Sequence, residues 1–199
     1  MTEHHKDYAG AKLGMWLFLF TEILLFGGLF LLYSAYLHRY GADFHHASQA
    51  LDKVIGGLNT VVLITSSLFM ALSITAVQKG EKGRCLLFLA LTIAMAGAFM
   101  VNKFFEWSAK FAHGVYPDSA HLLTLPQGEQ VFYGLYFTMT GLHGVHVVVG
   151  AAVLGLVMRQ VRRDKVNAGD YVLLENSGLY WHIVDLVWIF LFPLFYLIT

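Results

Sequence analysis

Five long stretches of the chain are almost free of charged side chains and are separated by short polar segments. Asp, Glu, Lys and Arg are absent from 54–77 and from 131–158, and 13–37 carries only Glu22. A helix that crosses the hydrocarbon core of a bilayer needs about twenty predominantly apolar residues. The pattern therefore predicts five transmembrane helices, the third being the shortest, at about 13–37, 54–77, 85–105, 131–158 and 171–198.

The composition agrees with a protein that is solvated by lipid. Apolar residues make up 57% of the chain and charged residues 13%, whereas a typical soluble domain is about a quarter charged. The formal net charge is zero, so no basic excess indicates a nucleic-acid partner. The one cysteine, Cys85, excludes an internal disulfide and a thiolate metal cluster. We therefore expect an all-α membrane protein with a single membrane domain, 1–199.

The positions of Lys and Arg predict how the helices are oriented, because cytoplasmic loops carry an excess of these residues. Four of them fall on one predicted side of the membrane: Arg39, Lys53, Lys103 and Lys110. The other nine fall on the side of the N-terminus: Lys6, Lys12, Lys79, Lys82, Arg84, Arg159, Arg162, Arg163 and Lys165. We therefore expect the N-terminus in the cytoplasm and the C-terminus outside it.

Five ionisable side chains stand out deep inside the predicted spans, where lipid ordinarily excludes them: Glu22, His143, His146, His182 and Asp185. At about 1.5 Å of rise per residue, Glu22 lies roughly 13 Å from the cytoplasmic start of its helix. By the same measure, His182 and Asp185 lie about 16 and 21 Å along the last helix. His146 and His143 lie about 18 and 22 Å from the cytoplasmic end of theirs. The five side chains are therefore predicted to share one middle layer of the bundle.

The spacing of these residues leaves several interpretations open. His143 and His146 are three residues apart and share a helix face, as do His182 and Asp185. One interpretation is structural, with each imidazole bonded to a carboxylate or a carbonyl of the bundle. A second is an independent membrane cytochrome with a haem between His146 and His182, or a metal site. A third is a proton-coupled transporter that uses Glu22 and Asp185.

Five short motifs, in order along the chain, carry a resemblance to a known family. They are TEILLFGGLF at 21–30, LNTVVLITSS at 58–67, KFFEW at 103–107, TGLHGVH at 140–146 and YWHIVDLVW at 180–188. In this order they resemble subunit III of the haem-copper respiratory oxidases, and the resemblance covers about residues 13–198. The TGLHGVH segment is the most specific of the five.

The resemblance implies a helical bundle around a lipid-filled cleft, with bound phospholipid and no cofactor in this chain. The partners it implies are subunit I, which holds haems and copper, and subunit II. The implied role is non-catalytic: the chain stabilises subunit I and supports proton uptake in a proton-pumping oxidase that passes electrons from cytochrome c to oxygen. The positions it implies as buried polar or cleft residues are Glu22, Glu106, His143, His146, His182, Asp185 and Trp188.

Longer members of the family have seven helices, and this chain lacks the first two. It therefore resembles the five-helix bacterial forms, including those of quinol oxidases, and we expect a multi-pass protein of the bacterial inner membrane. A related group accompanies nitric oxide reductases and is an alternative. Because no phosphate-binding loop, serine-hydrolase elbow or zinc-protease motif is present, any chemistry is expected to belong to another chain.

Overall fold

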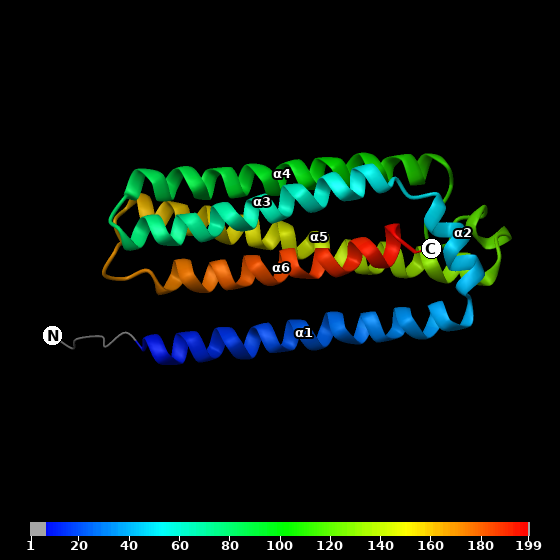
Figure 1. The fold of residues 1–199 in the computed structure, drawn as a ribbon, viewed down its shortest axis with the longest axis horizontal. Helices are drawn as coiled ribbons and strands as arrows, with labels where there is room; N and C mark the ends of the chain where they lie inside the picture. The colour runs from blue at the N-terminus through cyan, green and yellow to red at the C-terminus, as the bar shows by residue number, and fades with distance from the viewer. Residues whose placement is uncertain (1–6, 199) are drawn as a thin grey trace.

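The computed structural model describes residues 7–198 and shows an all-helical bundle (Figure 1). Five helices within this range are long and apolar enough to cross a membrane, as the sequence predicts. They are α1 (Tyr8–Arg39), α3 (Lys53–Gln78), α4 (Lys82–Ala112), α5 (Gln127–Arg162) and α6 (Val172–Tyr196), with the short α2 (Gly41–Gln49) and a 3-10 turn, η1 (Leu122–Thr124), between them.

The prediction that the third span is the shortest is wrong, because α4 has 31 residues where 85–105 was expected. The helix continues past Lys103, whose ammonium bonds the carboxylate of Glu106 one turn later, at 3.1 Å. Pairing lowers the cost of placing these two charges inside an apolar helix. Counting charge-free residues therefore underestimates this span.

The helix α2 was not predicted, because its sequence GADFHHASQ has no apolar run. It lies across one end of the bundle (Figure 1) and covers the N-terminus of α5. Asp43 of α2 accepts a hydrogen bond from the backbone N–H of Gly128 at 3.1 Å, and His46 contacts Glu129 at 3.0 Å. The carboxylate of Asp43 thus satisfies an N–H that the first turn of a helix leaves unpaired.

The two ends of the bundle differ in charge. We call the end with the start of α1 and the α3–α4 and α5–α6 connections the N-terminal end, and the end with α2 and the chain's C-terminus the C-terminal end (Figure 1). The basic residues separate between these ends as the sequence predicts, except that Lys6 lies outside the described residues. At the N-terminal end, the Lys82 ammonium joins the two connections by a 2.6 Å contact with Asp164.

The core is built around two tryptophans of α6. The rings of Trp181 and Trp188 are fully buried, and their N–H groups donate to the hydroxyls of Ser66 and Thr60 of α3, at 3.1 and 3.0 Å. Gly150 of α5 admits Trp181, since a Cβ there would lie 2.9 Å from its ring. Small residues thus bring these helices close together, as is usual for helices packed in lipid.

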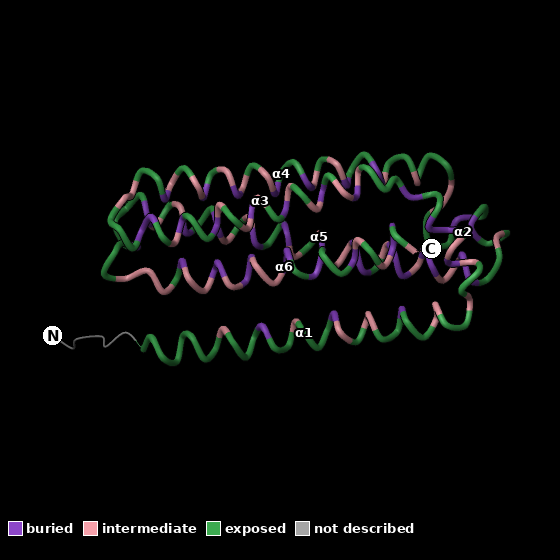
Figure 2. Tube along the Cα trace, viewed as in Figure 1, coloured by how far each residue is buried: buried purple, intermediate pink, exposed green. Residues whose placement is uncertain are grey.

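The first helix is loosely attached to the rest of the bundle. Figure 2 shows α1 mostly exposed, and its buried residues are Leu19, Phe26 and Tyr33. It is held at the N-terminal end by the 3.0 Å ion pair between Lys12 and Glu175, and near the other end by the Tyr33 hydroxyl, which donates to a backbone carbonyl of α6. The exposed face of α1 is almost entirely apolar, so lipid or another chain is its natural neighbour.

Candidate functional site

Glu22 of α1 and His146 of α5 form a pair near the middle of their helices. The Oε2 atom of Glu22 lies 2.9 Å from Nε2 of His146, and Nδ1 of His146 lies 2.8 Å from the carbonyl oxygen of Leu142. A carbonyl can only accept, so Nδ1 carries a hydrogen. The carboxyl and Nε2 therefore share one further proton, held by either group. Both arrangements have zero net charge, which makes the pair tolerable in an apolar segment.

His143 extends this pair into the core. Glu22, His146 and His143 border one small cavity of about 10 Å³, so the predicted shared layer is confirmed for these three residues. The ring of His143 lies between Phe99 and Trp188, at centroid distances of 5.5 and 5.4 Å. Neither of its ring nitrogens has a hydrogen-bond partner among the described residues. The expectation that each imidazole bonds a carboxylate or a carbonyl is therefore wrong for His143.

His182 and Asp185 lie on the other side of α6 and line a groove between α3 and α6. The Nδ1 atom of His182 lies 2.6 Å from the hydroxyl oxygen of Ser67. Asp185 is 3% exposed, and neither of its carboxylate oxygens has a hydrogen-bond partner among the described residues. The groove has a volume of about 410 Å³. The prediction that His182 and Asp185 share a helix face is confirmed.

The structure does not bring His146 and His182 together as a haem between them requires. The α6 residue that stacks on His146 is Tyr180, at 6.4 Å, and its hydroxyl donates to the His146 carbonyl. His182, two residues further along α6, bonds α3 instead and borders a different cavity. Across residues 7–198, no three or more His, Cys, Asp or Glu side chains are grouped as a metal site.

A second buried cluster lies towards the C-terminal end, around Lys103. Its ammonium donates to Glu106 and to the hydroxyls of Tyr136 and Tyr196, at 3.0 to 3.1 Å. Both tyrosine hydroxyls donate to the other carboxylate oxygen of Glu106, each at 2.6 Å. The resemblance implies Glu106 as a buried polar position, but its pairing with Lys103 was not predicted, and the two tyrosines lie in otherwise apolar helices that give no sequence signal.

Trp188 connects the two clusters. The indole ring of Trp188 packs against the ring of His143. The same indole lies 5.2 Å from the ammonium of Lys103, within the range of a cation–π contact. Its N–H is occupied by Thr60. The resemblance implies Trp188 as a site position, and the structure places its ring between the ring of His143 and the cluster around Lys103.

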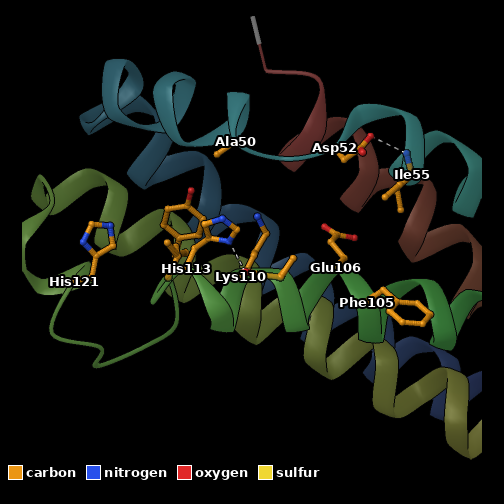
Figure 3. Close-up of a pocket in the computed structure, with 11 residues that line it drawn as sticks. Ala50, Asp52, Ile55, Phe105, Glu106, Lys110, His113 and His121 are labelled. Atoms are coloured by element: carbon orange, nitrogen blue, oxygen red, sulfur yellow. Dashed lines mark hydrogen bonds between the residues drawn. The ribbon is translucent and has the colours of Figure 1, made fainter.

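Beyond this cluster, a cavity of about 610 Å³ opens at the C-terminal end (Figure 3). Asp52 on its wall accepts from two backbone N–H groups at the start of α3, and Glu106 is held by the cluster just described. Figure 3 shows Lys110 between His113 and Glu106, and the Lys110 ammonium lies 5.7 Å from the ring centre of Tyr133. Both carboxylates are thus used in holding the fold together.

Comparison with known proteins identifies the family to which this sequence is similar. The family model for cytochrome c oxidase subunit III matches residues 2–199. Cytochrome c oxidase subunit 3 of Thermostichus vulcanus is 31% identical, over 98% of this chain and 90% of its own length. Cytochrome bo(3) ubiquinol oxidase subunit 3 of Pseudomonas aeruginosa is 28% identical, over 98% of this chain and 88% of its own. A probable quinol oxidase subunit 3 of Staphylococcus haemolyticus is also 28% identical, over 94% and 88%.

The family match covers residues 2–199 and so includes all five sequence motifs. The five long apolar helices of the structure agree with this match. Cytochrome c and quinol oxidases both occur among these relatives, so the family is resolved while the electron donor is not. The chain belongs to the cytochrome c oxidase subunit III family, in its five-helix form.

Proposed function

We propose that this haem-copper oxidase subunit is non-catalytic, that it stabilises the catalytic subunit I, and that it supports proton uptake there. The observation that carries the proposal is the Glu22–His146 pair, which ties the loosely attached α1 to α5 at mid-depth. A carboxyl at this depth is costly unless it has a role or a partner. We infer that the pair keeps α1 in place beside subunit I while holding a proton inside the membrane.

A lipid-lined cleft beside α1 is part of the same proposal. An apolar groove of about 200 Å³ runs between α1 and α6, lined by Ile23, Phe26, Gly27 and Phe30 of the former and Ile183, Leu186, Val187 and Phe190 of the latter. No polar side chain lines it, so the acyl chain of a phospholipid matches its chemistry. The pair at Glu22 lies at its edge, where loss of the pair would let α1 move away.

The test is a comparison of Glu22→Gln and Glu22→Ala oxidases with the unaltered enzyme. We expect Glu22→Ala to shorten the catalytic lifetime, counted as turnovers before inactivation, or to lower proton pumping, with the haem spectra unchanged. Glu22→Gln keeps a hydrogen-bonding group opposite His146, so its catalytic lifetime and proton pumping should lie between those of Glu22→Ala and those of the unaltered enzyme. The matched control is Leu156→Ala on the exposed face of α5. Altered haem spectra with an unchanged lifetime would contradict the proposed role.

For the electron donor, we propose cytochrome c, with subunit II as the second partner. The alternative is a quinol oxidase, which the relatives from Pseudomonas and Staphylococcus favour by their names. The names of all three relatives indicate oxidases, which supports an oxidase over association with a nitric oxide reductase. Oxygen consumption by the purified complex, measured with reduced cytochrome c and separately with a quinol, decides between the donors.

We also propose that the chain lies in a bacterial inner membrane with its N-terminal end in the cytoplasm. The support is the concentration of basic side chains at that end, which favours retention on the cytoplasmic side. On this orientation, proton uptake takes place at the end where Lys82 and Asp164 join the connections.

A further inference from the structure

The cavity at the C-terminal end contains a lysine whose ammonium lacks an acceptor within this chain. Lys110 is half-buried on the wall of the cavity, and its ammonium makes no hydrogen bond or ion pair within residues 7–198. The ammonium lies 5.7 and 5.6 Å from the ring centres of Tyr133 and Tyr136. Ring faces attract the cation, but they leave its three N–H groups without an oxygen acceptor. Lys110 is thus placed to bind an anion that enters the cavity.

The two carboxylates on the cavity wall differ in what they leave open to a ligand. Glu106 uses both of its oxygens within the buried cluster around Lys103. Asp52 accepts two backbone N–H groups at the start of α3, but both bonds go to Oδ1, so its Oδ2 atom can still accept. One cation, on Lys110, and one acidic oxygen, on Asp52, therefore remain for a ligand.

The cavity lies at the level of lipid headgroups. The helix α4 has 31 residues and is about 46 Å long, whereas the hydrocarbon core of a bilayer is about 30 Å thick. With the helix centred in the bilayer, Lys110 lies about 20 Å from the middle plane and Phe105 about 12 Å from it. The ammonium is therefore among the headgroups, while Phe105 reaches the hydrocarbon core.

Exposed apolar side chains lead from the cavity into the membrane. Phe105, which is 65% exposed, lines the cavity, and Val101, which is 53% exposed, lies one turn deeper on the same face of α4. On α3, Ile55 lines the cavity and Leu58, which is 54% exposed, follows one turn deeper. A cavity of about 610 Å³ with a cation, continued by two apolar helix faces, matches a headgroup and its acyl chains.

We propose that this cavity binds the headgroup of a phospholipid, with the phosphate on the ammonium of Lys110 and the acyl chains along α3 and α4. The amine of a phosphatidylethanolamine headgroup then donates to Oδ2 of Asp52. This zwitterionic headgroup matches one cation and one open carboxylate oxygen, whereas phosphatidylglycerol brings a phosphate and no cation. The site is separate from the α1–α6 groove, and it does not depend on the function proposed above.

Photolabelling of the full chain in detergent tests where the lipid binds. The probe is a phosphatidylethanolamine with a photoreactive diazirine in its acyl chain, and the labelled peptides are mapped. We expect label on 101–105, reduced at least about tenfold in Lys110→Met, as for loss of a hydrogen bond to a charged group. The matched control, Lys53→Met, removes an exposed lysine of the same end that does not line the cavity, and it should keep the label. Equal labelling of Lys110→Met and the unaltered chain would overturn the proposal.

Competition against the photolabel tests the headgroup. Unlabelled phosphatidylethanolamine should displace it at a severalfold lower concentration than phosphatidylglycerol with the same acyl chains. Asp52→Asn, which can still cap α3, should remove this preference. Displacement by inorganic phosphate but by neither phospholipid would identify a site for a free anion and overturn the proposal, and equal displacement by the two phospholipids would overturn the match to the amine. Should Lys110→Met not fold, the comparison with Asp52→Asn still decides.

Discussion

Replacing Lys103 with methionine removes the cation from the buried cluster of α4 and leaves the carboxylate of Glu106 without its charged partner. Both side chains are almost fully buried, with 6% and 5% of their side-chain surface exposed. Two tyrosine hydroxyls still donate to Glu106, but they do not neutralise its charge. Breaking one half of a buried ion pair typically costs about 3–5 kcal/mol, and we expect a loss of that size here.

The double variant Lys103→Met with Glu106→Gln separates the charge from the packing. It leaves no uncompensated charge, and the glutamine carbonyl still accepts a hydrogen bond from Tyr136 or Tyr196. We therefore expect it to recover at least about 2 kcal/mol relative to Lys103→Met alone, within the coupling energies that contacting residues show. The control is Lys110→Met on the same helix. Its ammonium lies over the rings of Tyr133 and Tyr136 and attracts Glu106 from beyond ion-pair distance, so the expected loss is about 1 kcal/mol or less.

The assay is the free energy of unfolding of the purified chain in bicelles, measured by steric trapping, for the three variants and the unaltered protein. If Lys103→Met costs less than about 1 kcal/mol, the cluster does not hold the fold as we describe. A double variant as unstable as Lys103→Met would show that the loss comes from packing rather than from the unpaired carboxylate.

Two further predictions concern packing and orientation. Gly150→Ala should destabilise the chain by about 1–3 kcal/mol, because the new Cβ meets the ring of Trp181, whereas Gly155→Ala has open space and should be neutral or stabilising in the same unfolding assay. In right-side-out vesicles, an impermeant thiol reagent should label Ala120→Cys at the C-terminal end and not Ala168→Cys at the N-terminal end, and the reverse pattern contradicts the proposed orientation.

The sequence predicts the architecture better than it predicts the contacts. Charge-free runs are long enough to define the spans, and helix rise alone places Glu22 and His146 at similar depth. The sequence does not show that Glu22 and His146 are in contact, because they are 124 residues apart and a single sequence does not specify which helices are neighbours. Ser67 could not be identified as the partner of His182 for the same reason, since a hydroxyl in an apolar run carries no periodic signal.

The most direct test of a non-catalytic, stabilising role uses the oxidase purified through a tag on its catalytic subunit, with and without this chain. The quantities to measure are the haem spectrum, the initial rate of oxygen reduction and the number of turnovers before inactivation. We expect the spectrum and the initial rate to be preserved without the chain, and the lifetime to fall severalfold and to be restored when the chain is added back. Loss of haem signals together with the chain, or an unchanged lifetime, would contradict that role.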